Sequence, residues 1–317
     1  MRAPRRISEI LKRKELFLDE VRTKLENTTL RLQTDLFKNI IEEIIPRLDV
    51  EKGVLLDNAH NYRLISELDR IYETFNVKIV QTILPQINKG TGLIADLAKD
   101  YFVLTLTGDL PKRFIQILES TKVLTDLRLG LRMGKMIRGG NLMSMLRIDP
   151  LDFKQLMSKA VTSQMDMKSF INVIKENITG TEEKTGLLER QFRRFAYDTY
   201  QQYDAAYNKN LANEFGMKYF IYQGGLIKDS RDFCVCHNGK VFSIEETETW
   251  QDWTPAKCDF PEGYVIKQKD VYAKPSYLGF AGYDPLVDRG GYNCRHILGY
   301  ISDELAFRMR PDLRKKE

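Results

Sequence analysis

The residues most able to carry chemistry lie close together near the C-terminus. All four cysteines and two of the three histidines fall between Cys234 and His296. A Cys-x-Cys-His group at 234–237 is followed about sixty residues later by a Cys-x-His pair. Thiolate sulfur and imidazole nitrogen are ligands that zinc prefers, and four of them complete its tetrahedral coordination. We therefore predict a zinc site in this segment.

The predicted zinc ligands are Cys234, Cys236, Cys294 and His296. In an extended segment, side chains two residues apart point to the same side, so each pair would present both of its ligands together. Two such pairs facing each other would close the coordination shell. The spacing differs from the Cys-x2-Cys of common zinc ribbons.

Two other interpretations of the cysteines stay open. They could be small buried thiols, or Cys234 and Cys294 could form a disulfide. Disulfides persist in oxidising compartments, whereas the N-terminal residues Met-Arg-Ala-Pro-Arg-Arg lack the apolar core of a secretory signal. We therefore expect the thiols to meet a reducing cytoplasm.

Two short sequence motifs, called phrases below, contain these ligands. The first is Ser230-Arg231-Asp232-Phe233-Cys234, continued by Asn238-Gly239-Lys240-Val241-Phe242 and by an acidic stretch that leads to Trp250. The second is Gly291-Tyr292-Asn293-Cys294-Arg295-His296. Together they resemble the C-terminal part of the Mu-F-like phage head morphogenesis family, over roughly residues 182–303.

The resemblance implies a minor structural protein of a tailed-phage virion that acts in head morphogenesis and is not an enzyme. The implied partners are the portal and the major capsid protein, at the portal vertex or the capsid interior, after assembly in the host cytoplasm. Many relatives have a histidine three residues before the second cysteine, where this chain has Gly291. The fourth ligand is therefore open among Cys236, His237 and Cys258.

Length and composition are those of a globular protein. The 317 residues suffice for two domains, and 43% hydrophobic with 29% charged residues is ordinary for such chains. No apolar run approaches the ~20 residues of a membrane-spanning helix, so we expect no membrane partner. The net charge of +5 is mild.

Positive charge is unevenly placed. Basic residues gather at both ends of the chain: Arg2, Arg5, Arg6, Lys12, Arg13 and Lys14, then Arg308, Arg310, Arg314, Lys315 and Lys316. Four more share one face of a predicted helix: Arg128, Arg132, Lys135 and Arg138. Both groups are solvated charges or, alternatively, sequence-independent contacts with the phosphates of packaged DNA, and the helix face could also contact an acidic partner. The second interpretation would make the chain a DNA-binding internal head protein.

A further alternative is a zinc-dependent hydrolase acting on nucleic acid. Such an enzyme needs an open coordination position and a general base beside it. Acidic residues close in sequence to the first ligand group include Glu246, but its position three residues after Ser243 is typical of a capping box. No phosphate-binding Gly-rich loop with a lysine and no His-Glu-x-x-His appears. We therefore predict no catalytic activity.

Helical periodicity dominates the first 216 residues. Leucines recur every seven residues at 11, 18, 25 and 32, which predicts a long amphipathic helix over about 6–45 within an arm at 1–50. This seam packs either on a partner chain, including a second copy, or on the chain's own helices. The helical body at 51–216 contains periodic segments at 58–75, 77–84, 94–105, 111–139, 150–178 and 188–215.

The residue pattern changes after Gly216 from helical periodicity to strand-forming and turn residues. Tyr219-Phe220-Ile221-Tyr222 favours a strand, and Asn238-Gly239 is a turn dipeptide before another. We predict an α+β fold, with a mainly helical N-terminal body and a small β-rich, zinc-binding C-terminal module at 217–303. A basic tail is expected at 304–317.

Overall fold

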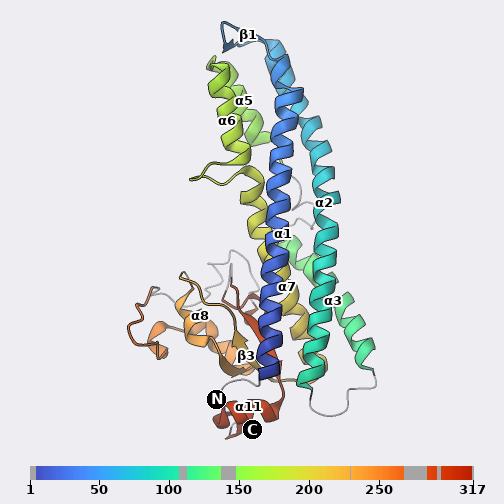
Figure 1. Ribbon diagram of the computed structural model, residues 1–317, viewed down its shortest axis with the longest axis vertical. Coiled ribbons are helices and arrows are strands. Elements are labelled where there is room, and N and C mark those ends of the chain that lie inside the picture. The colour runs from blue at the N-terminus through green and yellow to red at the C-terminus, as the bar shows by residue number, and fades with distance from the viewer. Residues whose placement is uncertain are drawn as a thin grey trace. The chain divides into compact units, whose positions relative to one another are not determined.

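The computed structural model describes residues 5–106, 113–136, 148–228, 230–267, 284–290 and 294–315 (Figure 1). Within these ranges, the side chains of residues 5, 126–136, 190–198, 251, 252 and 315 are outside the description. The described chain is mostly helical with small antiparallel sheets, which agrees with the predicted α+β class. Among the described helices, none combines the length and apolar character that crossing a membrane requires.

Long helices make up most of the first 214 residues. They are α1 (Arg5–Glu43), α2 (Ala59–Thr105), α3 (Phe114–Met136), α5 (Leu151–Thr162), α6 (Met167–Thr179) and α7 (Leu187–Glu214). A short 3-10 helix, η1 (Ile45–Arg47), and a hairpin of β1 (Val50–Glu51) and β2 (Val54–Leu55) separate α1 from α2.

The elements after Gly216 are short. The strands are β3 (Tyr219–Gln223), β4 (Lys240–Ser243) and β5 (Ile297–Ile301). The α-helices are α8 (Asp232–His237), α10 (Pro285–Asp288) and α11 (Asp303–Met309). The 3-10 helices are η2 (Glu245–Asp252), η3 (Pro255–Lys257) and η4 (Pro311–Lys315).

The first helix forms as predicted, and α1 ends two residues before the expected limit of 45. Its four heptad leucines are at most 3% exposed, so the seam lies in the chain's own core. Thr28 of the same helix is also buried. Its hydroxyl donates to the Lys24 carbonyl at 2.9 Å and accepts from Gln86 Nε2 at 3.1 Å. The leucine seam is therefore not a free surface for a second copy.

The periodic segments at 58–75, 77–84 and 94–105 belong to one helix. A single helix, α2, continues through Pro85 and Gly90. Buried isoleucines at 79, 83 and 87 carry one apolar stripe across the proline, and packing of such a stripe outweighs local helix propensity. A Cβ at Gly90 would overlap the ring of Tyr200, so this glycine permits close packing on α7 and does not break the helix.

The chain forms two compact units, and they do not follow the predicted linear division. One unit comprises residues 1–21, 88–141 and 197–317, and the other 22–87 and 142–196. In the first unit, the β5 backbone lies against helices. Tyr101 of α2 donates to the Tyr300 carbonyl at 2.9 Å, and the absent side chain of Gly299 leaves space for Leu11 of α1. The module at 217–303 therefore shares its core with helical segments.

The strands β4, β3 and β5 form one antiparallel sheet with β3 in the middle. Phe220 of β3 is paired with Phe242 on one side and Tyr300 on the other. Four of the five β3 residues are buried, as expected for a central strand covered on both faces. The predicted turn at Asn238-Gly239 is confirmed, because Gly239 has a φ of 78° and donates its N–H to the Tyr222 carbonyl at 2.7 Å.

The expected basic tail at 304–317 was wrong for the residues that the structure describes. Residues 303–315 form α11 and η4, and Leu305, Ala306 and Leu313 are buried. Arg310 makes a bidentate ion pair with Glu246, at 2.6 and 2.7 Å. The buried apolar side chains and the Arg310–Glu246 ion pair hold this segment in place, whereas Arg308 and Arg314 are exposed.

Lys14, assigned to the basic N-terminal group, is buried in an ion pair. Its Nζ lies 2.5 Å from Asp204 Oδ1, and both side chains are at most 2% exposed. Asp204 Oδ1 also accepts from Asn208 Nδ2 at 2.9 Å. Burial lowers the pKa of Lys14 while the Asp204 carboxylate opposes that shift.

Replacing Lys14 by methionine should therefore lower the free energy of unfolding by about 3–5 kcal/mol, because the carboxylate of Asp204 loses its buried cation. Urea unfolding measures the change. The control is Lys38→Met, whose ammonium is exposed and lies 3.7 Å from Glu42. The control should change stability by less than about 1 kcal/mol. Equal effects of the two substitutions would contradict the assignment of a buried pair.

Candidate metal centre

Cys234 is positioned by the short helix α8. Arg231 precedes the helix in extended conformation, and Asp232 begins it. The Asp232 carboxylate is fully buried and accepts from the Tyr264 hydroxyl at 2.6 Å and the Lys267 N–H at 3.0 Å. Asp232 therefore fixes the start of the helix to residues 264–267, and Cys234 lies on the following half turn.

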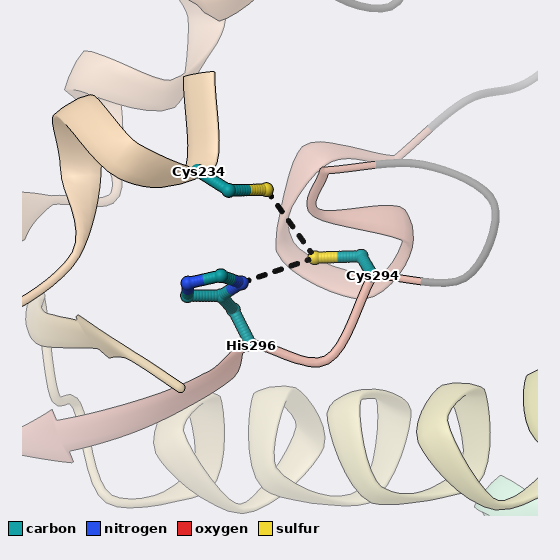
Figure 2. A group of neighbouring side chains, drawn as sticks. All are labelled: Cys234, Cys294 and His296. Carbon is teal, nitrogen blue, oxygen red and sulfur yellow. Dashed lines mark hydrogen bonds between the residues drawn. The ribbon is translucent and has the colours of Figure 1, made fainter. Parts of the chain in front are cut away.

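Cys234, Cys294 and His296 come together and form what we call the Cys–His cluster. Figure 2 shows the three side chains pointing toward one another. The Cys234 and Cys294 sulfurs are 4.0 Å apart, and Cys294 Sγ lies 3.7 Å from His296 Nδ1. All three possible ligand atoms lie within 4.8 Å of one another, and all three residues are buried. This arrangement could hold a metal ion.

Tyr222 and Gly290 complete the surroundings of the cluster. The Tyr222 hydroxyl lies 3.5 Å from Cys234 Sγ and 3.4 Å from Cys294 Sγ, and its ring stacks on the His296 ring with centroids 4.7 Å apart. A Cβ on Gly290 would lie 2.6 and 2.8 Å from the two sulfurs. The missing side chain of Gly290 therefore leaves the space beside both thiols open.

Arg289 anchors the backbone that carries His296. Its guanidinium donates to the His296 carbonyl at 2.5 Å and to the Gln201 carbonyl of α7 at 2.9 Å. Arg289 itself has a φ of 50°, at the end of α10. A buried arginine with charge-assisted bonds to two carbonyls keeps the second ligand segment fixed to α7.

The pKa values of the two thiols shift in opposite directions. The hydrogen bond to Cys294, followed by burial, raises the pKa of Cys234 well above its usual value. Burial also opposes ionisation of Cys294, but hydrogen bonds from Cys234 and His296 and the charges of His296 and Arg289 outweigh it and lower the pKa of Cys294. Cys294 is therefore the more readily ionised thiol of the pair, and the thiolate is the form that binds metals.

Cys236 and Cys258 do not join the cluster, which corrects the predicted ligand Cys236 and the alternative ligand Cys258. They form a disulfide with each other, while Cys234 and Cys294 are free thiols. The prediction assumed an extended segment, but residues 232–237 are helical. Residues two apart on an α-helix are separated by about 200° around its axis, so Cys236 faces away from the direction of Cys234.

His237, the other alternative ligand, belongs to an aromatic group. Its Nδ1 lies 2.7 Å from the Phe233 carbonyl, and its ring stacks on Phe233 and Phe242 with centroids 3.8 and 5.0 Å apart. Burial lowers the pKa of His237 to about 4, although the hydrogen bond to Phe233 opposes the shift. The imidazole is therefore neutral at pH 7, and the stacked rings of Phe233 and Phe242 fix its position.

This burial predicts a loss of stability in acid. Above an ordinary histidine pKa of 6.5, His237 is neutral in both folded and unfolded chains and stability is unaffected. Between 6.5 and about 4, only the unfolded chain takes up the proton, so stability falls by about 3 kcal/mol in total. Urea unfolding at pH 7 and about pH 4.5, in chelator, should show a smaller difference in His237→Phe than in the original chain. Equal differences would contradict this.

The structure does not describe the side chains of the predicted phosphate contacts. Arg128, Arg132 and Lys135 belong to α3, but their side chains, and Arg138 altogether, lie outside the described residues. Gly291 lies outside them as well. Ser243 and Glu246 form the predicted reciprocal capping bonds, at 2.9 and 3.3 Å.

Comparisons of this chain with protein families, curated proteins and solved structures find no match.

Proposed function

We propose that the Cys–His cluster binds a structural zinc ion. The observation that carries this proposal is the convergence of two thiols and one imidazole, from separate segments, on the space that Gly290 leaves open. Zinc bound to sulfur at about 2.3 Å and to nitrogen at about 2.0 Å places tetrahedral neighbours roughly 3.5–3.8 Å apart. The separations of 4.0 and 3.7 Å are close to these values. Cys234, Cys294 and His296 are the proposed ligands.

A structural ion is favoured over a catalytic one. The three proposed ligands are at most 4% exposed, so a substrate has little access to the ion. Glu246, which the hydrolase interpretation would use as the general base, is held in a bidentate ion pair by Arg310. His237 is enclosed by aromatic rings. Three protein ligands leave one coordination position open, but hydrolysis also requires a general base beside it, and no carboxylate or second imidazole joins the cluster among the described residues.

The function we propose is that of a minor structural protein of a tailed-phage head. It rests on the resemblance of the two phrases around the cluster to the Mu-F-like family, since those phrases supply all three cluster residues. The chain acts in head assembly and contacts the portal or the major capsid protein, at the portal vertex or the capsid interior. The zinc ion rigidifies a module rich in loops, where short strands alone bury little surface.

Purified heads of the phage that encodes this chain provide the test. Quantitative mass spectrometry should find the chain in them, at far fewer copies than the major capsid protein. The purified chain should not cut DNA with Mg²⁺, Mn²⁺ or Zn²⁺. Absence from heads, together with zinc-dependent cleavage that Cys294→Ser abolishes, would contradict the structural role and favour a hydrolase.

A further inference from the structure

The fourth coordination position of the proposed zinc ion calls for a further ligand. Two thiols and one imidazole fill three positions of a tetrahedron. The alternatives that the sequence offered do not supply the fourth, because Cys236 and Cys258 form a disulfide and His237 Nδ1 lies 2.7 Å from the Phe233 carbonyl. Tyr222 brings a donor of another kind, a hydroxyl oxygen, to the cluster.

The distances from the Tyr222 hydroxyl to the sulfurs fit a shared zinc ion. The oxygen lies 3.5 Å from Cys234 Sγ and 3.4 Å from Cys294 Sγ. Zinc bound to sulfur at about 2.3 Å and to oxygen at about 2.0 Å places the two donor atoms of a tetrahedron roughly 3.5 Å apart. The two sulfurs are farther from each other, at 4.0 Å, as expected because zinc–sulfur bonds are longer than zinc–oxygen bonds.

Gly290 shows that the hydroxyl and the sulfurs border the same small space. A Cβ built on this glycine would lie 2.6 Å from Cys234 Sγ, 2.8 Å from Cys294 Sγ and 3.2 Å from the Tyr222 oxygen. One point near all three donor atoms thus holds no side-chain atom. The Tyr222 oxygen therefore faces the space in which we place the ion.

The position of the Tyr222 ring is fixed by its neighbours. Tyr222 lies in β3, the middle strand of the sheet, and is fully buried. Its ring stacks on the His296 ring, with an angle of 21° between the planes, and meets Phe233 and Trp250 edge to face with centroids 5.8 and 5.7 Å apart. The stacked rings bring the hydroxyl and His296 Nδ1 to within 3.4 and 3.7 Å of the same Cys294 sulfur. The four donors are therefore held together before any metal binds.

A buried positive charge beside the cluster favours a phenolate ligand. Two thiolates and one phenolate carry one negative charge more than a zinc ion neutralises, and a net charge is costly inside a protein. The Arg289 guanidinium is 2% exposed and donates to the His296 carbonyl at 2.5 Å. Its charge therefore offsets the additional negative charge of the site.

We propose that Tyr222 is the fourth zinc ligand and binds through its hydroxyl oxygen. On binding, the zinc–oxygen bond forms and the hydroxyl proton leaves to solvent. This inference rests on the zinc proposal and gives the ion two sulfur ligands, one nitrogen and one oxygen. A protein ligand in the fourth position excludes the water molecule that a catalytic zinc carries there. Tyr222 thereby keeps the ion structural.

Cobalt(II) in place of zinc tests this, because its visible spectrum changes with the number and kind of its ligands. The original chain should give the spectrum of a four-coordinate ion, and added azide should not alter it. In Tyr222→Phe, water takes the fourth position, so the spectrum should differ from the original and change again with azide. Zinc should bind this variant at least about tenfold more weakly, the lower end of what groups around metal ligands contribute.

The matched control is Tyr101→Phe, which also removes a buried hydroxyl. That hydroxyl donates to the Tyr300 carbonyl at 2.9 Å. The control should keep the original cobalt spectrum, its indifference to azide and its zinc affinity. Equal changes in the two variants would overturn the assignment, since a general effect of losing a buried hydroxyl would then explain them.

The remaining outcomes separate this inference from the zinc proposal. If Tyr222→Phe keeps the original spectrum and ignores azide, or if azide alters the spectrum of the original chain, Tyr222 is not a ligand although the cluster binds metal. A chain that binds neither zinc nor cobalt would overturn both proposals. Should Tyr222→Phe fail to fold, the original chain still decides: zinc should produce the ultraviolet difference absorption of a metal-bound phenolate, and its absence would overturn the inference.

Discussion

Replacing Cys294 by serine should abolish zinc binding and destabilise the C-terminal module. Cys294 is the central ligand, since its sulfur contacts both Cys234 Sγ and His296 Nδ1. A ligand that binds only the folded chain stabilises it by about 4 kcal/mol when its concentration is a thousand times Kd. Thermal unfolding with zinc should therefore show a clear drop in Tm for Cys294→Ser. In chelator, the original chain should lose a similar amount and the variant almost nothing.

The matched control is the double variant Cys236→Ser/Cys258→Ser. It removes the disulfide but none of the three proposed ligands. Its Tm is expected to fall because a cross-link is lost, yet it should still respond to zinc as the original chain does. A zinc response that survives in Cys294→Ser and disappears in the control would show that the wrong pair of cysteines had been assigned to the metal.

Replacing Gly290 by alanine should block zinc binding while leaving every ligand in place. The added Cβ would lie 2.6 Å from Cys234 Sγ, 2.8 Å from Cys294 Sγ and 3.2 Å from the Tyr222 hydroxyl. These distances are shorter than ordinary van der Waals contact, and two of the three neighbours are the proposed ligand atoms. We expect zinc affinity to fall at least about a hundredfold, comparable to the effect of disturbing residues that orient metal ligands. Competition with a chromogenic chelator measures it.

Gly92→Ala is the control for this substitution. Gly92 lies inside α2, and a Cβ there would meet no atom within 4 Å. Alanine favours a helix over glycine by up to about 1 kcal/mol, so this variant should be as stable as the original chain or more so, with unchanged zinc affinity. If Gly290→Ala binds zinc as tightly as the original chain, the ion does not bind in the space beside the thiols.

The helices were largely predictable because their apolar spacing is local information. The heptad leucines predicted α1, and the run that Gly216 ends predicted α7. The single helix α2, which joins three periodic segments, depends on residues elsewhere in the chain. Gly90 faces the ring of Tyr200, more than a hundred residues away, and no local pattern reveals that contact.

The candidate site was predictable in part. Clustering of rare ligand types pointed to Cys234, Cys294 and His296, and the structure brings these three together. Cys236 was assigned wrongly because its direction depends on whether residues 232–237 are extended or helical, and six residues carry too little periodicity to decide.

Three supporting residues were missed altogether. Tyr222 looks like an ordinary strand residue, and Arg289 and Gly290 come immediately before the second phrase. Their roles depend on contacts across the fold: Tyr222 with both sulfurs, Arg289 with the Gln201 carbonyl, and Gly290 with the same sulfurs. The only signal in the sequence was the Gly290-Gly291 pair, which marks a close approach of backbone as readily as a turn.

The most direct test of the zinc proposal is the metal content of the purified chain. Protein produced with zinc in the medium and freed of loosely bound metal should contain one zinc per chain by plasma mass spectrometry, and Cys294→Ser should contain none. Hydrogen exchange of β3 would confirm in the same samples that the sheet is folded. A zinc content near zero in the original chain, with β3 still protected, would contradict the account.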